Sequence, residues 1–297
     1  MSTSIEIRPL FALRDMYPAV ELQRAYWGDD VESVIPAHML FSLANHGGHV
    51  LAAFDGSRMV GVLVGFLGTD IEYDRPAMAN LQMVSKRMVV LPEYRGHGLG
   101  YRLKLAQREL TMRQGVRLVT WTFDPLLALN AHLNIRKLGA ICQKFRENYY
   151  GEDEAGGLAV LGASDRLFVE WWITHRRVKE RLEGRRSGLG LAQYLDADVV
   201  IINPTIASTD GTPWPAERTR DVVGSMVLME IPRDYPAISR TDESLARAWR
   251  LHTRQQIELL MRAGYIVTDF IRDAHEGRER AFYLFSQRGP QFDFSQN

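Results

Sequence analysis

The sequence predicts an α/β fold with a mixed sheet, because strand-like and helix-like segments alternate along its 297 residues. Runs such as "IEIRPL" (5–10) alternate apolar and polar residues as strands do. By contrast, the apolar residues Leu99, Leu103, Ala106 and Leu110 repeat at helical spacing. A hydrophobic content of 46 % supplies ample apolar surface for a core.

In the first half, these segments follow one another in a regular order. Pro92 ends one strand, and Pro125 begins a helix that Gly139 ends. The turn Asp55-Gly56-Ser57 predicts a hairpin. The predicted elements are a strand at 5–10, helices at 13–27 and from 36, a hairpin at 49–68, a strand at 81–92, a helix from 99, a strand at 116–124, a helix at 125–139 and a strand at 140–151.

The second half is less regular. "MVLMEIPRDYP" echoes "MVVLPEYRG", and "AGYIVTDFIRD" echoes "QGVRLVTWTFD", so a degenerate second copy of the first half is one interpretation and an unrelated α/β extension is the other. The glycine- and acid-rich residues 151–165 predict a loop between a domain at 1–150 and a domain at 165–297. The predicted elements are strands at 166–173, 197–205, 224–232, 265–271 and 280–286, a short basic helix within 174–188 and a long helix at 242–264.

Composition excludes several classes of protein. Lys plus Arg and Asp plus Glu number 36 each, so a nucleic acid or an anionic membrane is not expected as a partner. The single cysteine, Cys142, cannot form an internal disulfide, and the chain opens on no basic or apolar leader, so a cytoplasmic location is expected. The longest apolar run, 59–68, is about half as long as a membrane-spanning helix. No metal site is predicted.

The most informative segment is "VVLPEYRGHGLGYRLK" (89–104), which joins a strand to a helix through Gly96, Gly98 and Gly100. The first amides of a helix have no intrahelical acceptor, and the helix dipole favours an anion there. Glycines let a phosphate approach without meeting a Cβ. A tight turn alone would need only one glycine, so three glycines beside Arg95 predict a phosphate or pyrophosphate site.

Two other phosphate-binding patterns fit this segment less well. The P-loop of NTPases requires Lys and Ser or Thr after its last glycine, where this chain has Tyr101 and Arg102. A dinucleotide fingerprint requires Gly-x-Gly-x-x-Gly, and here the third glycine comes one residue early. Asp124, at the end of the next strand, lies near the position of a ribose-binding acid and keeps a nucleotide-dependent oxidoreductase as an alternative.

The pattern Arg-x-x-Gly-x-Gly, preceded by Val-x-Pro-x-Tyr, resembles the acyl-CoA signature of the GNAT superfamily of N-acyltransferases. The segment "NAHLNIRKLGA" (130–140) and the order of strands and helices resemble this superfamily too, over about residues 5 to 150. The resemblance implies a GNAT fold with a C-terminal α/β extension. It also implies an enzyme that moves an acyl group from acyl-CoA to an amine.

The resemblance also implies which residues hold the acyl-CoA. The strand before the loop would separate from its neighbour, and its exposed backbone amides would stabilise negative charge on the thioester oxygen. Asn130 and Asn134, one helical turn apart, would contact the pantetheine amides. The backbone contacts to pantetheine and thioester would come from Met88, Val89 and Val90, and those to the pyrophosphate from Arg95, Gly96, His97, Gly98, Leu99, Gly100 and Tyr101.

Acyl transfer needs a neutral attacking amine and a proton for the leaving thiolate. Where many GNAT members have a tyrosine, this chain has Ile135, so the usual acid is missing. Asp124 is the expected general base, with a helix N-cap as the other interpretation of the same residue. Tyr149 is the expected substitute acid, with packing against Tyr150 as its other interpretation.

The donor and a basic segment leave alternatives open. The segments "TWTFDP" and "NAHLNIRKLGA" resemble GNAT members linked to N-succinylation of amino acids, so acetyl-CoA and succinyl-CoA are both expected as possible donors. Lys86, Arg87 and Arg136 are the cations that could meet a second carboxylate on the acyl group. The segment "HRRVKERLEGRR" (175–186) is either a solvated helix or part of a site for the CoA ribose phosphate or an anionic substrate.

The expected partner is a small-molecule amine such as an amino acid, because no charged groove indicates a polymer. Residues 165–297 are expected to shape the acceptor pocket or to form a homodimer contact. The alternative function is a non-catalytic acyl-CoA-binding module, which the missing tyrosine supports.

Overall fold

The computed structural model describes residues 5–28, 33–70, 76, 80–151, 163–186, 188–207 and 211–289. The chain divides into two compact units. Unit 1 contains residues 1–121 and Trp172–Thr174, and unit 2 contains the rest of the described chain. Most of the loop predicted at 151–165 lies outside the described residues. The domain boundaries at 150 and 165 therefore stay a prediction.

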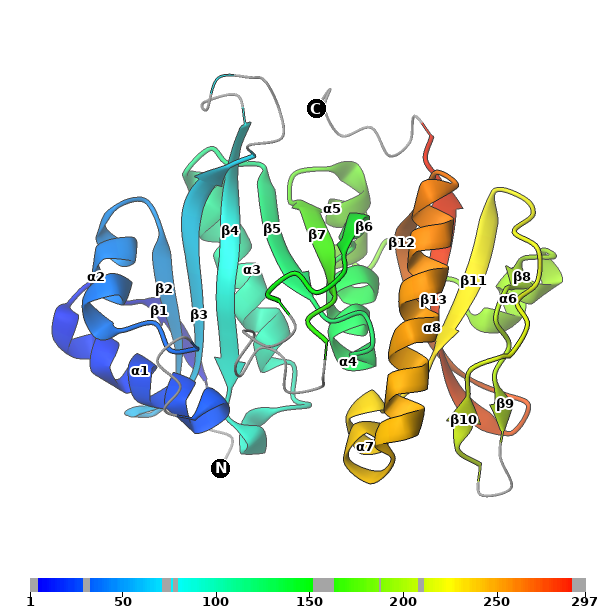
Figure 1. The fold of residues 1–297 in the computed structure, drawn as a ribbon. Coiled ribbons are helices and arrows are strands. Elements are labelled where there is room, and N and C mark those ends of the chain that lie inside the picture. The colour runs from blue at the N-terminus through cyan, green and yellow to red at the C-terminus, as the bar shows by residue number, and fades with distance from the viewer. Residues whose placement is uncertain are drawn as a thin grey trace. The chain divides into compact units, whose positions relative to one another are not determined.

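Unit 1 is built on a sheet with the strand order β1-β2-β3-β4-β5 (Figure 1). Neighbouring strands are antiparallel, except that β4 and β5 are parallel. A parallel pair needs a crossover connection, which α3 (Leu99–Arg113) provides. The strands are β1 (Glu6–Pro9), β2 (His49–Asp55), β3 (Arg58–Thr69), β4 (Leu81–Val90) and β5 (Leu118–Phe123), whose last two residues belong to unit 2.

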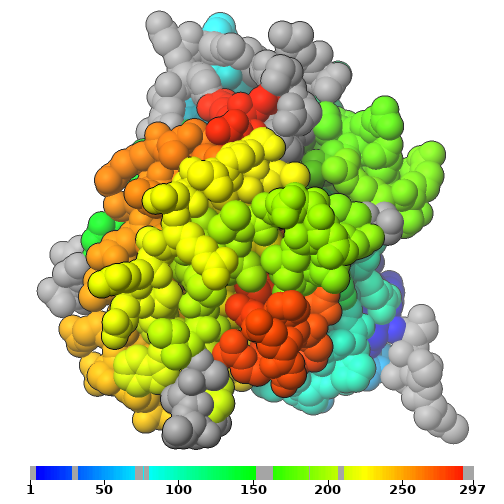
Figure 2. Space-filling view, turned by 90° about the vertical axis from the view of Figure 1, so that its right-hand side faces the viewer, coloured from blue at the N-terminus to red at the C-terminus, as the bar shows by residue number. Residues whose placement is uncertain are grey.

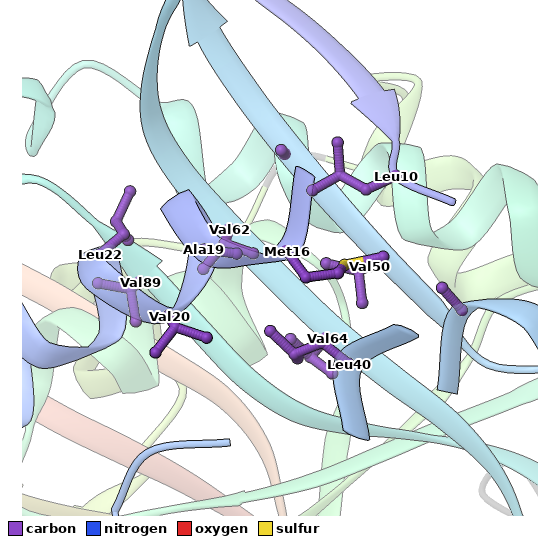
Figure 3. Packing of buried hydrophobic residues seen from close by; sticks show 12 residues of the cluster. Leu10, Met16, Ala19, Val20, Leu22, Leu40, Val50, Val62, Val64 and Val89 are labelled. Carbon is purple, nitrogen blue, oxygen red and sulfur yellow. The ribbon is translucent and has the colours of Figure 1, made fainter. Parts of the chain in front are cut away.

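Two helices pack on one face of this sheet: α1 (Leu13–Trp27) and α2 (Ala37–Asn45). Figure 3 shows Met16 and Val20 of α1 and Leu40 of α2 against the strand residues Val62 and Val64. All of these side chains are buried. The alternation of strand residues therefore places one apolar set under α1 and α2.

The other face of the sheet packs against α3. Leu99 and Leu103 of this helix lie with Leu51 and Leu63 of the strands in a second buried cluster. The predicted helical face from Leu99 is confirmed at these two positions. Since α3 begins directly after the glycine loop, this packing fixes where the N-terminus of the helix lies on the sheet.

Unit 2 has a second group of paired strands, in the order β7-β6-β12-β13-β11-β8. A separate two-stranded pair, β9 (Ile206–Ala207) with β10 (Pro213–Trp214), precedes β11. The larger set consists of β6 (Ile141–Arg146), β7 (Arg166–Trp172), β8 (Val200–Ile201), β11 (Met226–Ile231), β12 (Tyr265–His275) and β13 (Arg278–Gln287).

The helices of unit 2 include two that the sequence did not predict, α6 and α7. Helix α6 packs through Leu191 and Tyr194 on one set of strand residues, which includes Ile271 and Phe282. The predicted helix at 125–139 forms a short α-turn followed by a π-helical segment, η3. The helices are α4 (Ala128–Ala131), η3 (His132–Lys137), α5 (Arg176–Leu182), α6 (Leu191–Asp196), α7 (Tyr235–Thr241) and α8 (Glu243–Arg262).

The sequence echo between the two halves does not extend to strand pairing. β4 pairs in parallel with β5, whereas β13 lies between β11 and β12. The reason is a tight turn at Glu276 and Gly277, both with positive φ, which folds β13 back along β12. The segment from β11 to β12 therefore does not reproduce the pairing of β4 with β5. No helix among the described residues is long and apolar enough to span a membrane.

Candidate active site

The start of α3 presents a run of backbone amides without partners. The amides of Tyr94 and Arg95 donate to the carbonyl oxygens of Leu91 and Pro92. No described hydrogen bond uses the amides of residues 96–101, and the ladder of α3 begins where the Arg102 amide donates to the Gly98 oxygen at 3.0 Å. Because unpaired amides at a helix N-terminus favour an anion, this is the arrangement that a pyrophosphate requires.

Glycine is required in this loop by the backbone. Gly96 and Gly98 both have φ of +79°, a left-handed conformation that other residues adopt at a cost. A Cβ at either position would meet no atom within 4 Å. Space therefore lies open beside both glycines, and a bound phosphate would fit there.

Arg95 holds the loop to the end of β4. Its Nε donates to the Val90 oxygen at 2.9 Å, and its guanidinium lies 5.2 Å from the centroid of the Tyr26 ring. The arginine that flanks the glycines in the sequence therefore braces the loop in the structure. Any contact it makes with a phosphate would add to this bracing role.

The strand before the loop is paired differently on its two edges. β4 pairs with β3 over its whole length, from Leu81 to Val90, with a bulge at Lys86. Its described pairing with β5 covers only Met83 with Val119 and Val84 with Thr120. The two strands therefore part beyond Val84, on the edge that includes Met88, Val89 and Val90.

A buried polar cluster lies where the strands begin to part. Lys104 Nζ of α3 donates to Ser85 Oγ at 2.8 Å and to Gln107 Oε1 at 3.3 Å, and lies 3.5 Å from the centroid of the Trp121 ring. Gln107 Nε2 lies 2.9 Å from His49 Nε2. A Cβ at Gly65 would come within 2.6 Å of that histidine nitrogen, so glycine is needed there.

Burial controls the protonation of this cluster. It lowers the pKa of Lys104 well below the ordinary value, because no carboxylate is among its described partners. Burial first, and then the charge of Lys104, lower the pKa of His49 to about 4. His49 is therefore neutral in the folded protein at neutral pH, and Lys104 loses its proton more readily than an exposed lysine does.

Asp124 belongs to unit 2, where it is buried in an ion pair. Its two carboxylate oxygens accept from Arg250 Nη1 at 2.8 Å and Nη2 at 2.6 Å. Oδ1 also accepts from the Leu126 amide at 2.9 Å, so the side chain caps the turn that precedes α4. The residue is thus held in place by three donors, and α4 itself begins four residues later with Leu127 as its N-cap.

The other predicted residues of unit 2 differ in exposure. Asn130 is exposed and Asn134 is buried, one turn further along. Tyr149 lies in a turn after the end of β6, is 47 % exposed and packs edge-on against Phe168. The predicted strand at 140–151 ends earlier, at Arg146, because residues 147–150 form this turn.

A family model described as the Acetyltransferase (GNAT) family matches residues 13–134. The match covers less than half of the chain but includes β4, the glycine loop, α3 and β5. Residues 13–134 form a GNAT acetyltransferase domain. This match supports an acyl-CoA-dependent N-acyltransferase, so the predicted class of enzyme is confirmed.

Solved structures of acetyltransferases resemble the chain weakly. The ribosomal-protein-S18-alanine N-acetyltransferase from Escherichia coli is 15 % identical, with a TM-score of 0.44 over 58 % of this chain and 96 % of that chain. NAA60 of Arabidopsis thaliana, solved with a bisubstrate analogue, is 15 % identical, with a TM-score of 0.45 over 57 % and 98 %. An aminoglycoside acetyltransferase from an uncultured soil metagenomic sample, in complex with sisomicin, is 18 % identical, with a TM-score of 0.33 over 39 % and 74 %. These likenesses say nothing about the substrate of this chain.

No curated protein matches the sequence. The GNAT domain itself therefore provides the functional information. The residue at the place of the GNAT tyrosine, Ile135, is completely buried. Among the described residues, no group of three or more His, Cys, Asp or Glu side chains could hold a metal ion.

The GNAT signature gave no indication of the polar cluster around Lys104. Lys104, Gln107 and Thr111 are all buried and lie at spacings of three and four on α3. These three residues form a polar stripe along α3 beside its apolar stripe, and polar side chains on a helix are normally expected to be exposed. Only the spacing could have revealed it.

Proposed function

We propose that the protein transfers an acyl group from acyl-CoA to the amine of a small molecule. The observation that carries this proposal is the run of unpaired amides at 96–101, directly after the strand that parts from β5. In unit 1, the unpaired amides and the edge of β4 that does not pair with β5 therefore lie in one short segment of the chain. A diphosphate would bind the former, and the acyl-bearing arm would lie along the latter.

The transfer itself needs few groups. The neutral amine attacks the thioester carbon, a C–N bond forms, and the C–S bond breaks. The backbone of β4 from Met88 to Val90 is proposed to stabilise the negative charge that develops on the carbonyl oxygen. The amine loses a proton to a base, and the thiolate gains one from an acid.

Asp124 and Tyr149 are proposed as that base and that acid. Asp124 has the right chemistry, but its oxygens already accept three hydrogen bonds, so it would act by exchanging one of them or through water. Tyr149 is 47 % exposed, and no described hydrogen bond uses its hydroxyl. The pantetheine contacts expected from Asn130 and Asn134 belong to the same proposal.

The donor is proposed to be acetyl-CoA or succinyl-CoA. A succinyl donor carries a carboxylate that needs a cation. Arg87 is the best placed of the three candidate cations, because it lies on β4 next to Met88. Its side chain is buried, and its guanidinium lies 4.5 Å from the centroid of the Trp27 ring. Lys86 is exposed at the bulge, and Arg136 is already paired with Asp269 at 2.7 Å.

A non-catalytic acyl-CoA-binding module is the second candidate. The observation that favours it is Ile135, whose buried aliphatic side chain replaces the expected proton donor. The two candidates share the loop and differ only in turnover. Residues 1–150 would be the acyl-CoA-binding domain in both, while residues 165–297 would supply the acceptor pocket or a homodimer contact.

A two-way screen tests the proposal. The purified chain is incubated with acetyl-, succinyl- and longer acyl-CoA against a panel of amino acids and related amines, and release of free CoA is recorded. We expect release that depends on one class of amine. If acyl-CoA binds but no combination of donor and amine releases CoA, the function would be that of the non-catalytic binding module. If no acyl-CoA binds, both candidate functions would be rejected.

A further inference from the structure

Unit 2 contains a group of arginines, most of them largely buried, in addition to the proposed base and acid of the acyl transfer. We call Arg136, Arg177, Arg181, Arg186 and their neighbour Asp269 the arginine cluster. Arg177 and Arg181 come from the basic segment 175–186, for which the sequence predicts either a solvated helix or an anion site. Both are only 8 % exposed, so these two members are not solvated.

The cluster holds more positive than negative charge. Asp269 accepts from Arg136 Nη1 at 2.7 Å and from Arg181 Nη2 at the long distance of 3.4 Å. Arg177 donates to two backbone oxygens, those of Gly139 and Thr268. Arg186 adds a further positive charge that acts on both Arg177 and Arg181. Asp269 is thus shared by two of these guanidinium groups, while the carboxylate of Glu180 also interacts with Arg186.

Several buried nitrogens in and beside the cluster have no hydrogen-bond partner. Arg181 Nε is buried without a hydrogen bond, and so are Arg272 Nε and His132 Nδ1 nearby. Burial first, followed by the charges of Arg272, Lys137 and Arg136, lowers the pKa of His132 to about 4. A buried donor without an acceptor costs free energy, and that cost is removed if an anion supplies the acceptor.

Two members of the cluster reach the surface. Arg136 keeps 19 % of its side chain exposed, and Arg186 is exposed. Arg136 Nη2 donates to the Leu189 oxygen at 2.8 Å, and a Cβ at Gly188 would lie within 2.0 Å of the Arg136 guanidinium. The bare backbone before α6 therefore lies against Arg136. In Figure 2 the yellow-green surface of the segment that contains α6 faces the viewer.

We propose that the arginine cluster is a binding site for an oxyanion, either a phosphate or a carboxylate group, with Arg181 as its direct ligand. A guanidinium is a planar fork that holds both kinds of group through paired hydrogen bonds. Arg181 has the donors to spare, because its bond to Asp269 is long and its Nε is unused. Asp269 orients Arg136 and Arg181 and lowers the net charge without cancelling it.

This proposal goes beyond acyl transfer and does not depend on it. The test therefore uses the full chain with Gly98→Glu, which removes the other phosphate site at the loop of unit 1. Inorganic phosphate and succinate are titrated against this variant at constant ionic strength, by calorimetry and by melting temperature. We expect saturable binding and a melting temperature that rises with ligand concentration.

Arg181→Lys is the decisive second change, because it keeps the charge but loses the fork. We expect it to weaken binding at least tenfold. Arg176→Gln is the matched control, since Arg176 lies on the same helix with 85 % of its side chain exposed, and binding should be unchanged. Absence of saturable binding, or equal binding in the Arg181→Lys variant, would overturn the proposal for a free anion.

A further arm identifies whether the phosphate belongs to the coenzyme. The affinities for CoA and for dephospho-CoA are measured in the chain with the wild-type glycine loop, with and without Arg181→Lys. A tenfold preference for CoA that Arg181→Lys removes would assign the site to the coenzyme's own phosphate. The site proposal fails if this preference is unaffected and free anions do not bind either.

Discussion

Asp124 and Arg250 form a buried bidentate ion pair, with both carboxylate oxygens of Asp124 within 2.8 Å of the guanidinium nitrogens. The arginine comes from the middle of α8, and its side chain is only 5 % exposed. The pair therefore anchors the turn before α4 to the longest helix of unit 2. It also means that a role of Asp124 in proton transfer must be separated from its role in stability.

Asp124→Asn is expected to lower turnover far more than it lowers CoA affinity. Loss of the carboxylate removes the proposed base but leaves the amides of the glycine loop unchanged. The same change breaks a buried pair and should cost about 3–5 kcal/mol of unfolding free energy. Turnover per folded molecule, CoA binding and denaturant unfolding are measured together.

Asp165→Asn is the matched control for this variant. Asp165 is buried in the same network, within 3.9 Å of Arg250 and 2.9 Å of Arg254, and has no proposed catalytic role. It should lose stability but keep turnover per folded molecule. Normal turnover of the Asp124→Asn variant across pH would remove Asp124 from the mechanism.

Tyr149→Phe tests the proposed acid. No described hydrogen bond uses its hydroxyl, and phenylalanine keeps the edge-on contacts with Tyr150 and Phe168 at 4.8 and 5.1 Å. Stability should therefore stay the same while turnover falls by about 100-fold or more. Tyr150→Phe is the control with no proposed loss, and a Tyr149→Phe enzyme with full activity would leave packing as the role of this tyrosine.

Gly98→Glu is expected to abolish CoA binding. The new carboxylate would lie among the free amides and repel the diphosphate, and the positive φ would add roughly 1–2 kcal/mol of strain. Gly115→Glu is the matched control, because Gly115 also has positive φ and open space around it but lies after the end of α3. CoA affinity is measured by calorimetry in both variants, and equal affinity in the two would refute the loop assignment.

The glycine loop could be predicted because each of its properties is local. Three glycines, an arginine and a preceding proline fix a turn and a helix start within a few residues, and the structure places Gly98 as the N-cap of α3. Strand separation was implied by the family resemblance alone. The described pairing of β4 with β5 at only two positions agrees with it.

The remaining features depend on contacts between distant segments. Asp124 and Arg250 are far apart in sequence, and nothing in "WTFDP" indicates an arginine partner. The burial of Lys104 could not be predicted, because a lysine in an amphipathic helix normally indicates an exposed face. The burial of arginines in segment 175–186 could not be predicted for the same reason, since only the fold shows which side of a short helix faces inward.

Lys104→Met is expected to change how stability depends on pH. The pKa of Lys104 is lowered in the folded state, so between that value and about 10.4 the unfolded chain binds a proton that the folded chain does not. The unfolding free energy of the wild type should therefore rise with pH, by up to about 1.4 kcal/mol per unit from this one group. Methionine fills the same space beside Trp121 without a proton, so its curve should be flatter.

The control for Lys104→Met is Lys179→Met, at an exposed position on α5, which should follow the wild-type curve. Unfolding free energies are measured by urea titration from neutral to alkaline pH. Parallel curves for the wild type and the Lys104→Met variant would show that Lys104 keeps its proton in the folded state, stabilised by Ser85, Gln107 and Trp121.

His49→Gln is expected to make the protein more resistant to acid. The pKa of His49 is lowered to about 4 by burial and by Lys104, so between about 6.5 and 4 only the unfolded histidine gains a proton. The wild type should lose about 3 kcal/mol of unfolding free energy over this interval, and glutamine, which can still hydrogen-bond Gln107, removes that loss. His46→Gln, at an exposed position on the same sequence segment, is the control and should keep the wild-type acid sensitivity. If the His49→Gln variant lost stability between these pH values as steeply as the wild type, the buried cluster under α3 would not be the origin of the acid sensitivity.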